Sequence, residues 1–481
     1  MPTIKAPAIN KLNKVSDSSL MQRVSKIHLI GVGGAGMCGI AEILYNLGYE
    51  VSGSDIKSTK TIERLQKIGV KTYAGHDKKY VDKKDLVIVS AAIPSDNEEL
   101  VESKKRKIPI MKRAEMLAEL MRLRFGIAVA GTHGKTSTTG LIAHIMEHAG
   151  MDPTIIVGGR INEIRTNARL GDSKYLVAEA DESDGSFLHL HPTMSVITNI
   201  DTDHLSSYKD DFSLLRKAFL DFIHNLPFYG LAALCIDDKT LQELLPEIKR
   251  SFVTCAINFD ADYRAVNIRY EGLSSIFDIV VKATNERFTV ELSLPGEHNI
   301  LNALAAIAIT LELGIDKGHI KTALQEFQGT SRRFELNGAL QLQKNKVIWV
   351  DDYGHHPTEI IATIKTARIV WPEKRLIVVF QPHRYSRTRE MFENFVDALS
   401  QADILILLEI YSAGETRIDG INSSSLCNAI KKRKGAQVIF EENEAKLLDT
   451  LENLASTNDL LLTMGAGSIS SIVKQLSSRL I

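Results

Sequence analysis

The sequence predicts an α/β protein with parallel, doubly wound sheets. Short apolar runs rich in β-branched residues recur along the chain, and most of them lead into a glycine-rich or acidic turn. Segments with apolar residues at helical spacing lie between these runs. Strands that alternate with helices form parallel sheets, whose carboxyl ends collect the functional side chains.

Length and composition bound the class of protein. The chain has 481 residues, enough for about three domains. Its 44% hydrophobic and 24% charged residues are typical of a globular protein. A net charge of −1 gives no overall basic field, so we expect no nucleic-acid partner.

No segment of the sequence predicts a signal peptide or a membrane span. Residues 1–26 are polar with scattered lysines. The most apolar later stretch, Ala303–Ile315, is too short to cross a bilayer and contains Glu312. The four cysteines form no C-x-x-C pair, which favours reduced thiols. We therefore expect a cytoplasmic protein without membrane insertion.

Three domains are predicted to follow a flexible leader at residues 1–24. The first, residues 25–123, has strands at Ile27–Ile30, Glu50–Asp55 and Leu86–Ser90 and helices at Met37–Leu47 and Lys112–Arg124. The second, residues 124–334, has strands at Ile127–Ala130, Tyr175–Ala178 and Met194–Thr198, an antiparallel addition within Phe252–Leu294, and helices at Leu141–Ala149 and Gly296–Leu313. The third, residues 335–481, has strands at Val347–Val350, Leu376–Phe380, Ile404–Ile410 and Asp459–Met464.

The most informative motif is the loop after the strand Ile127–Ala130. Its residues are Gly131, Thr132, His133, Gly134, Lys135, Thr136 and Ser137. A glycine-rich turn that opens a helix directs backbone N–H groups at a polyphosphate. Lys135 can reach phosphate oxygens, and the Thr136 hydroxyl can bind Mg²⁺. Val129 stands where the first glycine of the usual motif belongs, which leaves a helix-capping turn as the alternative.

A second glycine turn follows the strand Ile27–Ile30. Gly31, Gly33 and Gly36 have the spacing of a dinucleotide-binding turn, and Asp55 follows about 20 residues later. The turn indicates a pyrophosphate at a helix N-terminus, and both NAD or FAD and a UDP group carry one. A purely structural turn is the third possibility.

Acidic residues follow two strands of the second domain. The run 179–184 contains Glu179 and three further acids directly after Tyr175–Ala178, and His204 follows Asp201 and Asp203 after the next strand. Carboxylates at this edge of a parallel sheet can hold Mg²⁺ beside a phosphate loop. A solvated acidic loop is the structural alternative. For His204 we predict contact with a metal or a phosphate.

Polar residues near the later helices complete the candidate site. Asn299 and Asn302 can bind an adenine edge or a phosphate, or they can simply cap and fill the core. The third domain adds Arg333, the run 351–357, and Arg384 and Arg387 after the strand Leu376–Phe380. Arginines at the carboxyl end of a strand are typical of carboxylate or phosphate binding, and a solvated basic turn is the alternative.

These motifs resemble those of the Mur ligase family, the ATP-dependent amide-forming enzymes of peptidoglycan synthesis. The resemblance runs from about residue 25 to the C-terminus, and the motifs occur in the same order. Residues 31–37 with 54–55, 179–187 and 351–357 are most similar to the members that join L-alanine to UDP-N-acetylmuramate. The resemblance implies a UDP-substrate domain, a central ATPase domain, and a C-terminal domain that brings in the amino acid.

The resemblance also implies roles for individual residues. Lys135, His204 and Arg333 are the implied catalytic residues, and Thr136, Glu179 and His204 the Mg²⁺ ligands. The implied ATP-binding residues are Gly131, Thr132, His133, Gly134, Lys135, Thr136, Ser137, Asn299, Asn302, Arg333 and Asp352. The implied substrate-binding residues are Gly33, Gly34, Ala35, Gly36, Asp55, Ser90, Tyr353, His355, Arg384 and Arg387.

The implied reaction passes through an acyl phosphate that the alanine amine then attacks, with His204 or His355 as the base. A recycling ligase that joins a whole peptide to the same UDP-sugar is the nearest alternative. An NAD-dependent oxidoreductase and a non-enzymatic nucleotide switch are more remote, because neither explains the arginines after Leu376–Phe380. We expect a monomer or a homodimer.

Overall fold

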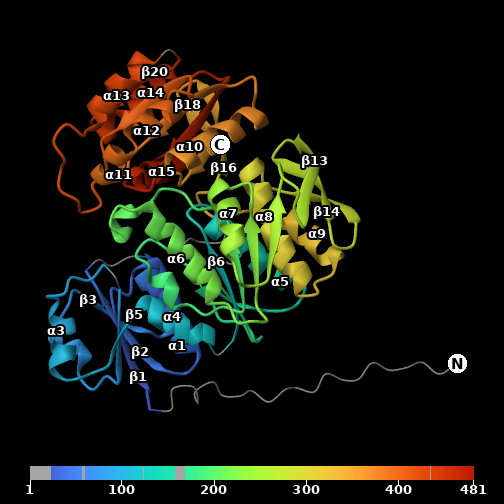
Figure 1. Cartoon of the computed structure of the whole chain (residues 1–481). Coiled ribbons are helices and arrows are strands. Elements are labelled where there is room, and N and C mark those ends of the chain that lie inside the picture. Colours follow the sequence, from blue (N-terminus) through green and yellow to red (C-terminus); the bar gives the residue numbers. More distant parts are fainter. Residues whose placement is uncertain are drawn as a thin grey trace. The chain divides into compact units, whose positions relative to one another are not determined.

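The computed structural model describes residues 23–56, 60–90, 92–122, 124–157, 168–433 and 435–480 (Figure 1). Most of the predicted leader, residues 1–22, lies outside the described residues. The chain divides into two compact units. The first comprises Met1–Leu117 and Ala168–Leu170, and the second comprises Ala118–Asn167 and Gly171–Ile481.

The first unit contains a parallel sheet with the strand order β3-β2-β1-β4-β5, coloured blue in Figure 1. Its strands are β1 (Lys26–Ile30), β2 (Glu50–Asp55), β3 (Lys71–Ala74), β4 (Leu86–Val89) and β5 (Ile110–Lys112). The helical elements are α1 (Ala35–Asn46), α2 (Lys60–Ile68), η2 (Lys78–Val81), α3 (Glu98–Lys105) and α4 (Arg113–Arg122), the last of which runs on into the second unit. The short strand β8 (Ala168–Arg169) is grouped with this unit.

The first sheet of the second unit has the order β15-β14-β13-β12-β11-β10-β6-β9-β7. Its strands are β6 (Phe125–Ala130), β7 (Thr154–Ile156), β9 (Tyr175–Glu179), β10 (Met194–Ile197), β11 (Leu231–Cys235), β12 (Phe252–Ala256), β13 (Tyr263–Glu271), β14 (Ser274–Val281) and β15 (Glu286–Leu292). Its helical elements are α5 (Lys135–His148), η3 (Ser186–His189), η4 (Leu205–Tyr208), α6 (Phe212–His224), α7 (Lys239–Leu244), η5 (Leu245–Glu247), α8 (Glu297–Glu312) and α9 (Lys317–Glu326). Helices α5, α8 and α9 pack together against this sheet.

The predicted antiparallel addition is correct only for the later part of its range. Strand β12 pairs in parallel with β11, because the helical segment between them carries the chain back across the sheet. The antiparallel part consists of β13, β14 and β15, which are joined by short turns.

The second sheet of this unit has the order β16-β17-β21-β18-β19-β20, and only the β16–β17 pair is antiparallel. Its strands are β16 (Glu335–Leu342), β17 (Asn345–Asp352), β18 (Arg375–Phe380), β19 (Ile404–Leu408), β20 (Gln437–Glu441) and β21 (Asp459–Met464). Its helical elements are α10 (Pro357–Val370), α11 (Tyr385–Glu390), α12 (Phe392–Leu399), α13 (Ser423–Lys432), η6 (Glu444–Lys446), α14 (Leu447–Leu454) and α15 (Ile469–Ser477).

Two apolar clusters flank this second sheet. One contains Ile360 of α10 and Phe395 of α12, and the other contains Leu451 of α14 and Ile472 of α15. The sheet is therefore covered by helices on both faces, as a doubly wound fold requires. The predicted α/β class is confirmed.

The four cysteines, Cys38, Cys235, Cys255 and Cys427, are buried free thiols. Within the described part of the chain, no helix combines the length and the apolar character that a membrane crossing needs.

Candidate active site

The phosphate loop, residues 131–136, is held against the segment that follows β10. Thr132 N donates to Asn199 O (3.1 Å), and His133 N donates to Asn199 Oδ1 (2.8 Å). Gly131 and Gly134 have φ values of +132° and +83°. A Cβ atom at Gly131 would lie 2.0 Å from Thr198 Oγ1. This loop therefore requires glycine for both its backbone angles and its close packing.

Lys135 points back into its own loop. Its Nζ donates to Gly131 O (2.6 Å), to Thr132 O (3.1 Å), and to both carboxylate oxygens of Glu182 (2.8 and 3.0 Å). Burial alone would lower the pKa of Lys135, but the charge of Glu182 and neighbouring acids raises it. The lysine stays charged, and phosphate oxygens would have to replace these carbonyl and carboxylate partners.

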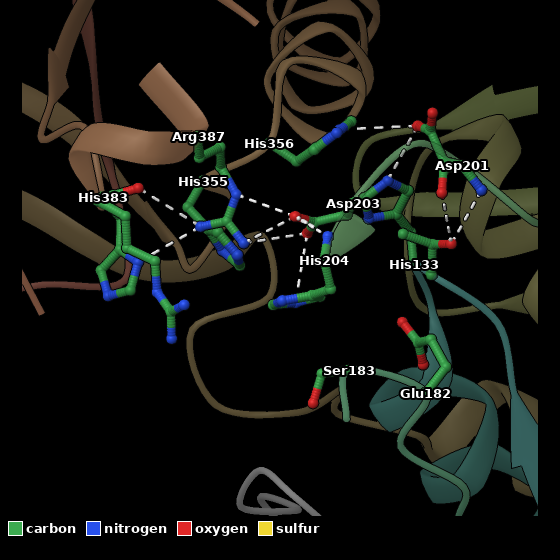
Figure 2. A network of polar contacts seen from close by, with 12 residues as sticks. His133, Glu182, Ser183, Asp201, Asp203, His204, His355, His356, His383 and Arg387 are labelled. Carbon is green, nitrogen blue, oxygen red and sulfur yellow. Dashed lines mark hydrogen bonds and ion pairs between the residues drawn. The ribbon is translucent and has the colours of Figure 1, made fainter. Parts of the chain in front are cut away.

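Sequence reasoning did not single out Glu182 as the partner of Lys135. Its side chain is only 2% exposed, and Figure 2 shows it near Ser183 in the segment after β9. The acidic run 179–184 was the available signal, but the sequence does not say which acid turns inward.

A cavity of about 580 Å³ lies beside the loop, a size typical of small-molecule sites. It brings together several of the predicted ATP-binding residues, namely His133, Gly134, Ser137, Asn299, Asn302, Arg333 and Asp352. Gly131, Thr132, Lys135 and Thr136 do not line it. Other lining residues were not predicted, among them Asp201, Asp238, His298, Thr358 and Glu359.

Asp352 is fixed by the backbone at the end of β17. Its Oδ2 accepts from Phe334 N (2.7 Å), and its Oδ1 accepts from Gly354 N (2.6 Å). Burial raises the pKa of Asp352 to about 6, although Arg333 opposes this shift. Arg333 Nη1 donates to Glu359 Oε1 (3.2 Å). Arg333, Glu359 and Asp352 thus give the lining of the cavity one cation and two carboxyl groups.

Two polar groups join the segments around the two sheets of the second unit (Figure 2). In the first, Arg387 contacts Asp203, with Nη2 at 2.9 and 3.0 Å from the carboxylate oxygens. Arg387 Nη1 also lies 3.3 Å from His383 Nδ1, and the His383 and His355 rings are 5.8 Å apart. His204 Nε2 lies 3.5 Å from Asp203 Oδ2.

The second group centres on Asp201. Its Oδ2 lies 3.2 Å from His133 Nε2 and 3.6 Å from His356 Nδ1, and it accepts from Thr358 Oγ1 (2.7 Å). Burial alone would lower the pKa of His133, but hydrogen bonds to Asp201 and Glu359 raise it to about 9. Burial lowers the pKa of His355 to about 3.

Two predicted substrate-binding residues of the second unit are more exposed. The side chain of Arg384 is 43% exposed, and its Nη1 is 4.0 Å from Glu415 Oε1. Tyr353 is 37% exposed, and the guanidinium groups of Arg332 and Arg333 each lie 5.4 Å from its ring centre. Both residues thus present polar groups to solvent.

The first unit holds the other predicted substrate-binding residues. Gly33 N donates to Asp55 Oδ2 (2.9 Å), and a Cβ atom at Gly31 would lie 3.1 Å from Ser90 Cβ. Gly34 caps α1, which begins with Ala35 and Gly36. A Cβ atom at Gly36 would meet the Arg113 guanidinium at 2.7 Å, a basic residue at this turn that sequence reasoning did not single out.

A buried polar network also lies behind this turn. Glu99, which is fully buried, accepts hydrogen bonds from His28 Nε2 (2.6 Å), His76 Nδ1 (2.7 Å) and Ser54 Oγ (2.9 Å). Burial lowers the pKa of His28, so this ring is neutral at pH 7. His76 follows β3 at the carboxyl edge of the sheet, where a nucleotide binds in such folds. The motifs gave no signal for this network.

Comparison with protein-family models covers most of the chain. Residues 26–125 match the model "Mur ligase family, catalytic domain", residues 129–310 match "Mur ligase middle domain", and residues 332–467 match "Mur ligase, glutamate ligase domain". The chain belongs to the Mur ligase family.

Solved Mur ligase structures are similar to much or most of the chain. UDP-N-acetylmuramate-alanine ligase from Thermotoga maritima is 29% identical, with a TM-score of 0.80, over 94% of this chain and 98% of that one. A murein peptide ligase from Psychrobacter arcticus is 24% identical, with a TM-score of 0.68 and the same coverage. UDP-N-acetylmuramate:L-alanyl-γ-D-glutamyl-meso-diaminopimelate ligase from Neisseria meningitidis is 27% identical, with a TM-score of 0.59, over 64% of this chain and 100% of that one.

The family confirms the amide-forming, ATP-dependent reaction class that the resemblance implies. Mur ligases are ATP-dependent, amide-forming ligases, so this Mur ligase is an enzyme of that class. This reaction class excludes an oxidoreductase and a non-enzymatic nucleotide switch. The glycine turn of the first unit, which was the basis of the oxidoreductase alternative, is therefore part of a Mur ligase.

The predicted metal ligands of this Mur ligase fit Mg²⁺ unequally. Glu179 ends β9, which pairs with the strand that enters the phosphate loop, and Thr136 lies in the first turn of α5. A carboxylate and a hydroxyl are the oxygen ligands that Mg²⁺ prefers. The imidazole of His204 suits other divalent metals better. Glu179 and Thr136 therefore fit the predicted ion, and His204 stays a prediction.

Proposed function

We propose that this Mur ligase joins L-alanine to the lactyl carboxylate of UDP-N-acetylmuramate, with ATP as the energy source. The observation that carries the proposal is the full-length likeness to an alanine ligase, at 29% identity and a TM-score of 0.80. Two peptide ligases are less similar, at 24% and 27% identity and with TM-scores of 0.68 and 0.59. The higher identity and TM-score of the alanine ligase favour a single amino acid as the acceptor.

The first step activates the UDP-sugar. Its carboxylate attacks the γ-phosphorus of ATP, the bond from that phosphorus to the β–γ bridging oxygen breaks, and ADP leaves. Negative charge develops on the transferring group. Lys135 and Arg333 are the cations that the proposal assigns to this charge, and a Mg²⁺ ion held by Thr136 and Glu179 would neutralise part of it when bound. Asp352, Asn299 and Asn302 would hold the nucleoside part of ATP in the cavity beside the loop.

The second step forms the amide. The alanine amine attacks the acyl phosphate, inorganic phosphate leaves, and a base accepts the amine proton. His204 and His355 are the two candidates. Burial lowers the pKa of both, so each ring is neutral at pH 7 and has a lone pair. Arg384 and Tyr353 would bind carboxylate groups of the reactants near these rings.

We assign the nucleotide end of the UDP-sugar to the first unit. Residues 33–36 form the N-terminus of α1. The backbone N–H groups at a helix N-terminus can bind a pyrophosphate. Asp55 ends β2 and Ser90 follows β4, the two strands on either side of β1, and both contact this turn. We further propose that the enzyme acts in the cytoplasm, as a monomer or a homodimer.

The test measures phosphate release from ATP and Mg²⁺ in the presence of UDP-N-acetylmuramate. Separate reactions contain L-alanine, an L-alanyl peptide, D-glutamate or no acceptor, and mass spectrometry identifies each product. We expect release that depends on L-alanine, with a product heavier by one alanine residue. The Lys135→Met variant is the control for contaminating ATPases.

Two outcomes contradict the proposal. Release only with the peptide would assign the chain to the peptide-recycling ligases, which the likeness to the Neisseria meningitidis enzyme keeps as the second candidate. Release without any acceptor, at the same rate as with L-alanine, would show that amide formation is not coupled to ATP cleavage.

A further inference from the structure

Among the described residues, one group of side chains has the composition and spacing of a metal site. The imidazoles of His133 and His356 and the carboxylate of Asp201 each offer a ligand atom, and these three atoms lie within 4.8 Å of one another. His133 belongs to the phosphate loop, and His356 caps α10. The group therefore joins two segments that are more than 200 residues apart in sequence.

Two distances within the group are close to those between the ligands of a tetrahedral ion. Asp201 Oδ2 lies 3.2 Å from His133 Nε2 and 3.6 Å from His356 Nδ1. Metal–ligand bonds of about 2.0–2.1 Å in a tetrahedron separate neighbouring ligand atoms by about 3.3–3.4 Å. These two distances are close to that separation, and the ligand atoms of the two histidines lie within 4.8 Å of each other.

The surrounding contacts are those that orient metal ligands. His133 Nδ1 lies 3.4 Å from Glu359 Oε1, so a carboxylate holds the nitrogen opposite the one that faces Asp201. Histidine ligands of metals usually donate their second N–H to a carboxylate in this way. Thr358 Oγ1 donates to Asp201 Oδ2 (2.7 Å), which fixes the carboxylate.

His356 is available as a ligand. The residue is only 3% exposed, and no described residue forms a hydrogen bond with its Nε2. The nitrogen that faces Asp201 is Nδ1, which accepts a long hydrogen bond from Thr358 N (3.3 Å). A bound ion would replace Thr358 N as the partner of the Nδ1 lone pair.

We propose that His133, Asp201 and His356 form a binding site for a divalent transition-metal ion such as Zn²⁺ or Co²⁺. Two imidazoles and one carboxylate favour these ions over Mg²⁺, which prefers oxygen ligands. None of these three residues is among the predicted Mg²⁺ ligands Thr136, Glu179 and His204. A bound ion would tie the phosphate loop to the amino end of α10. The proposal does not depend on which acceptor the enzyme uses.

The test uses the full-length chain without a histidine tag, stripped of metal by a chelator. CoCl₂ is added in the presence of excess Mg²⁺, and the visible absorption of bound Co²⁺ reports the coordination. Calorimetry with ZnCl₂ gives the stoichiometry. We expect one ion per chain, a Co²⁺ spectrum of low coordination number, and a higher melting temperature with Zn²⁺.

His356→Asn is the diagnostic variant, because asparagine retains the helix cap and removes the imidazole ligand. We expect at least about tenfold weaker Zn²⁺ binding, or about 1.4 kcal/mol. His133→Asn should give the same loss of Zn²⁺ binding. It replaces His356→Asn as the test if that variant does not fold. His319→Asn, which changes an exposed histidine of α9, should bind as the wild type does.

Two results would overturn the proposal. One is the absence of stoichiometric Co²⁺ or Zn²⁺ binding to the wild type. The other is binding that both His356→Asn and His133→Asn retain at full strength, because the ion would then be held elsewhere.

Discussion

Arg387 and Asp203 form a buried ion pair between segments of the two sheets of the second unit. Arg387 Nη2 lies 2.9 and 3.0 Å from the two carboxylate oxygens, and Nε lies 3.2 Å from Oδ1. The side chains are only 5% and 10% exposed. Burial would raise the pKa of Asp203, but Arg387 outweighs this effect and holds it well below its usual range. A substrate carboxylate that binds Arg387 must compete with Asp203.

The first prediction concerns this pair. Arg387→Ala leaves the Asp203 carboxylate buried without its cation, which typically costs about 3–5 kcal/mol. We expect a loss of that size in the free energy of unfolding. Urea unfolding followed by tryptophan fluorescence measures it, because Trp349 and Trp371 both lie in the second unit.

Arg389 provides the matched control, since its pair with Glu390 is exposed and 3.5 Å long. Arg389→Ala should cost less than about 1 kcal/mol. A similarly small loss for Arg387→Ala would mean that the pair with Asp203 does not stabilise the second unit.

Sequence reasoning located elements whose signal is local. The predicted strand Asp459–Met464 has the same bounds as β21, because a continuous apolar run such as Leu460–Leu462 predicts a buried strand without other information. The predicted strand Glu50–Asp55 has the bounds of β2, although most of its residues are polar or glycine. The phosphate loop could also be predicted from a local pattern, since its glycines, lysine and threonine all lie within residues 131–136.

The contacts between distant segments could not be predicted in this way. Asp203 and Arg387 are 184 residues apart, and each belongs to a motif that was interpreted separately as a ligand site. Nothing in either motif indicates that one charge neutralises the other. The partner of Lys135 was missed for a related reason, because the run 179–184 contains four acids and only the fold decides that Glu182 turns inward.

The second prediction tests the packing of the phosphate loop. At Gly134, φ is +83°, and an added Cβ atom would lie 2.5 Å from Asn302 Oδ1. Gly134→Ala should therefore weaken binding of a non-hydrolysable ATP analogue by at least about tenfold, as calorimetry would measure. Gly150→Ala is the control, because φ there is +72° but nothing lies within 4 Å of the new atom. It carries the same backbone strain, about 1–2 kcal/mol, without the clash. Equal affinities in the two variants would contradict the argument.

The third prediction uses the pH dependence of Asp238, which lines the cavity and caps α7 by accepting from Leu241 N (2.8 Å). Burial raises the pKa of Asp238 to about 6. The pKa of Asp238 is thus higher in the folded state than in the unfolded state, which means that the charged carboxylate destabilises the fold. The free energy of unfolding therefore falls as the pH rises through 6. Asp238→Asn keeps the cap and removes the charge.

We expect Asp238→Asn to unfold with a free energy about 1–2 kcal/mol higher than the wild type at pH 7.5, and most of this gain to disappear at pH 4.5. Urea titrations at the two pH values measure the difference. Asp211→Asn is the control, because Asp211 caps α6 but its backbone and side-chain hydrogen bonds to Ser213 lower its pKa. It should show no gain at pH 7.5. A gain for Asp238→Asn that does not change with pH would rule out the charge as its cause.

The fourth prediction separates the structural role of Lys135 from its catalytic role. Lys135→Met removes the cation that the proposal places on the transferring phosphate, so kcat should fall by about 10²–10³. The same change leaves the Glu182 carboxylate buried and without its cation, which should cost about 3–5 kcal/mol of stability. Binding of the UDP-sugar, which the proposal assigns to the first unit, should change little.

The double variant Lys135→Met with Glu182→Gln distinguishes the two effects. It removes both charges, so most of the lost stability should return, because no unpaired charge stays buried. Its kcat should remain as low as that of Lys135→Met. Urea unfolding and the phosphate-release assay on the three proteins measure both quantities. If kcat returned together with stability, Lys135 would act on the reaction only through its ion pair with Glu182.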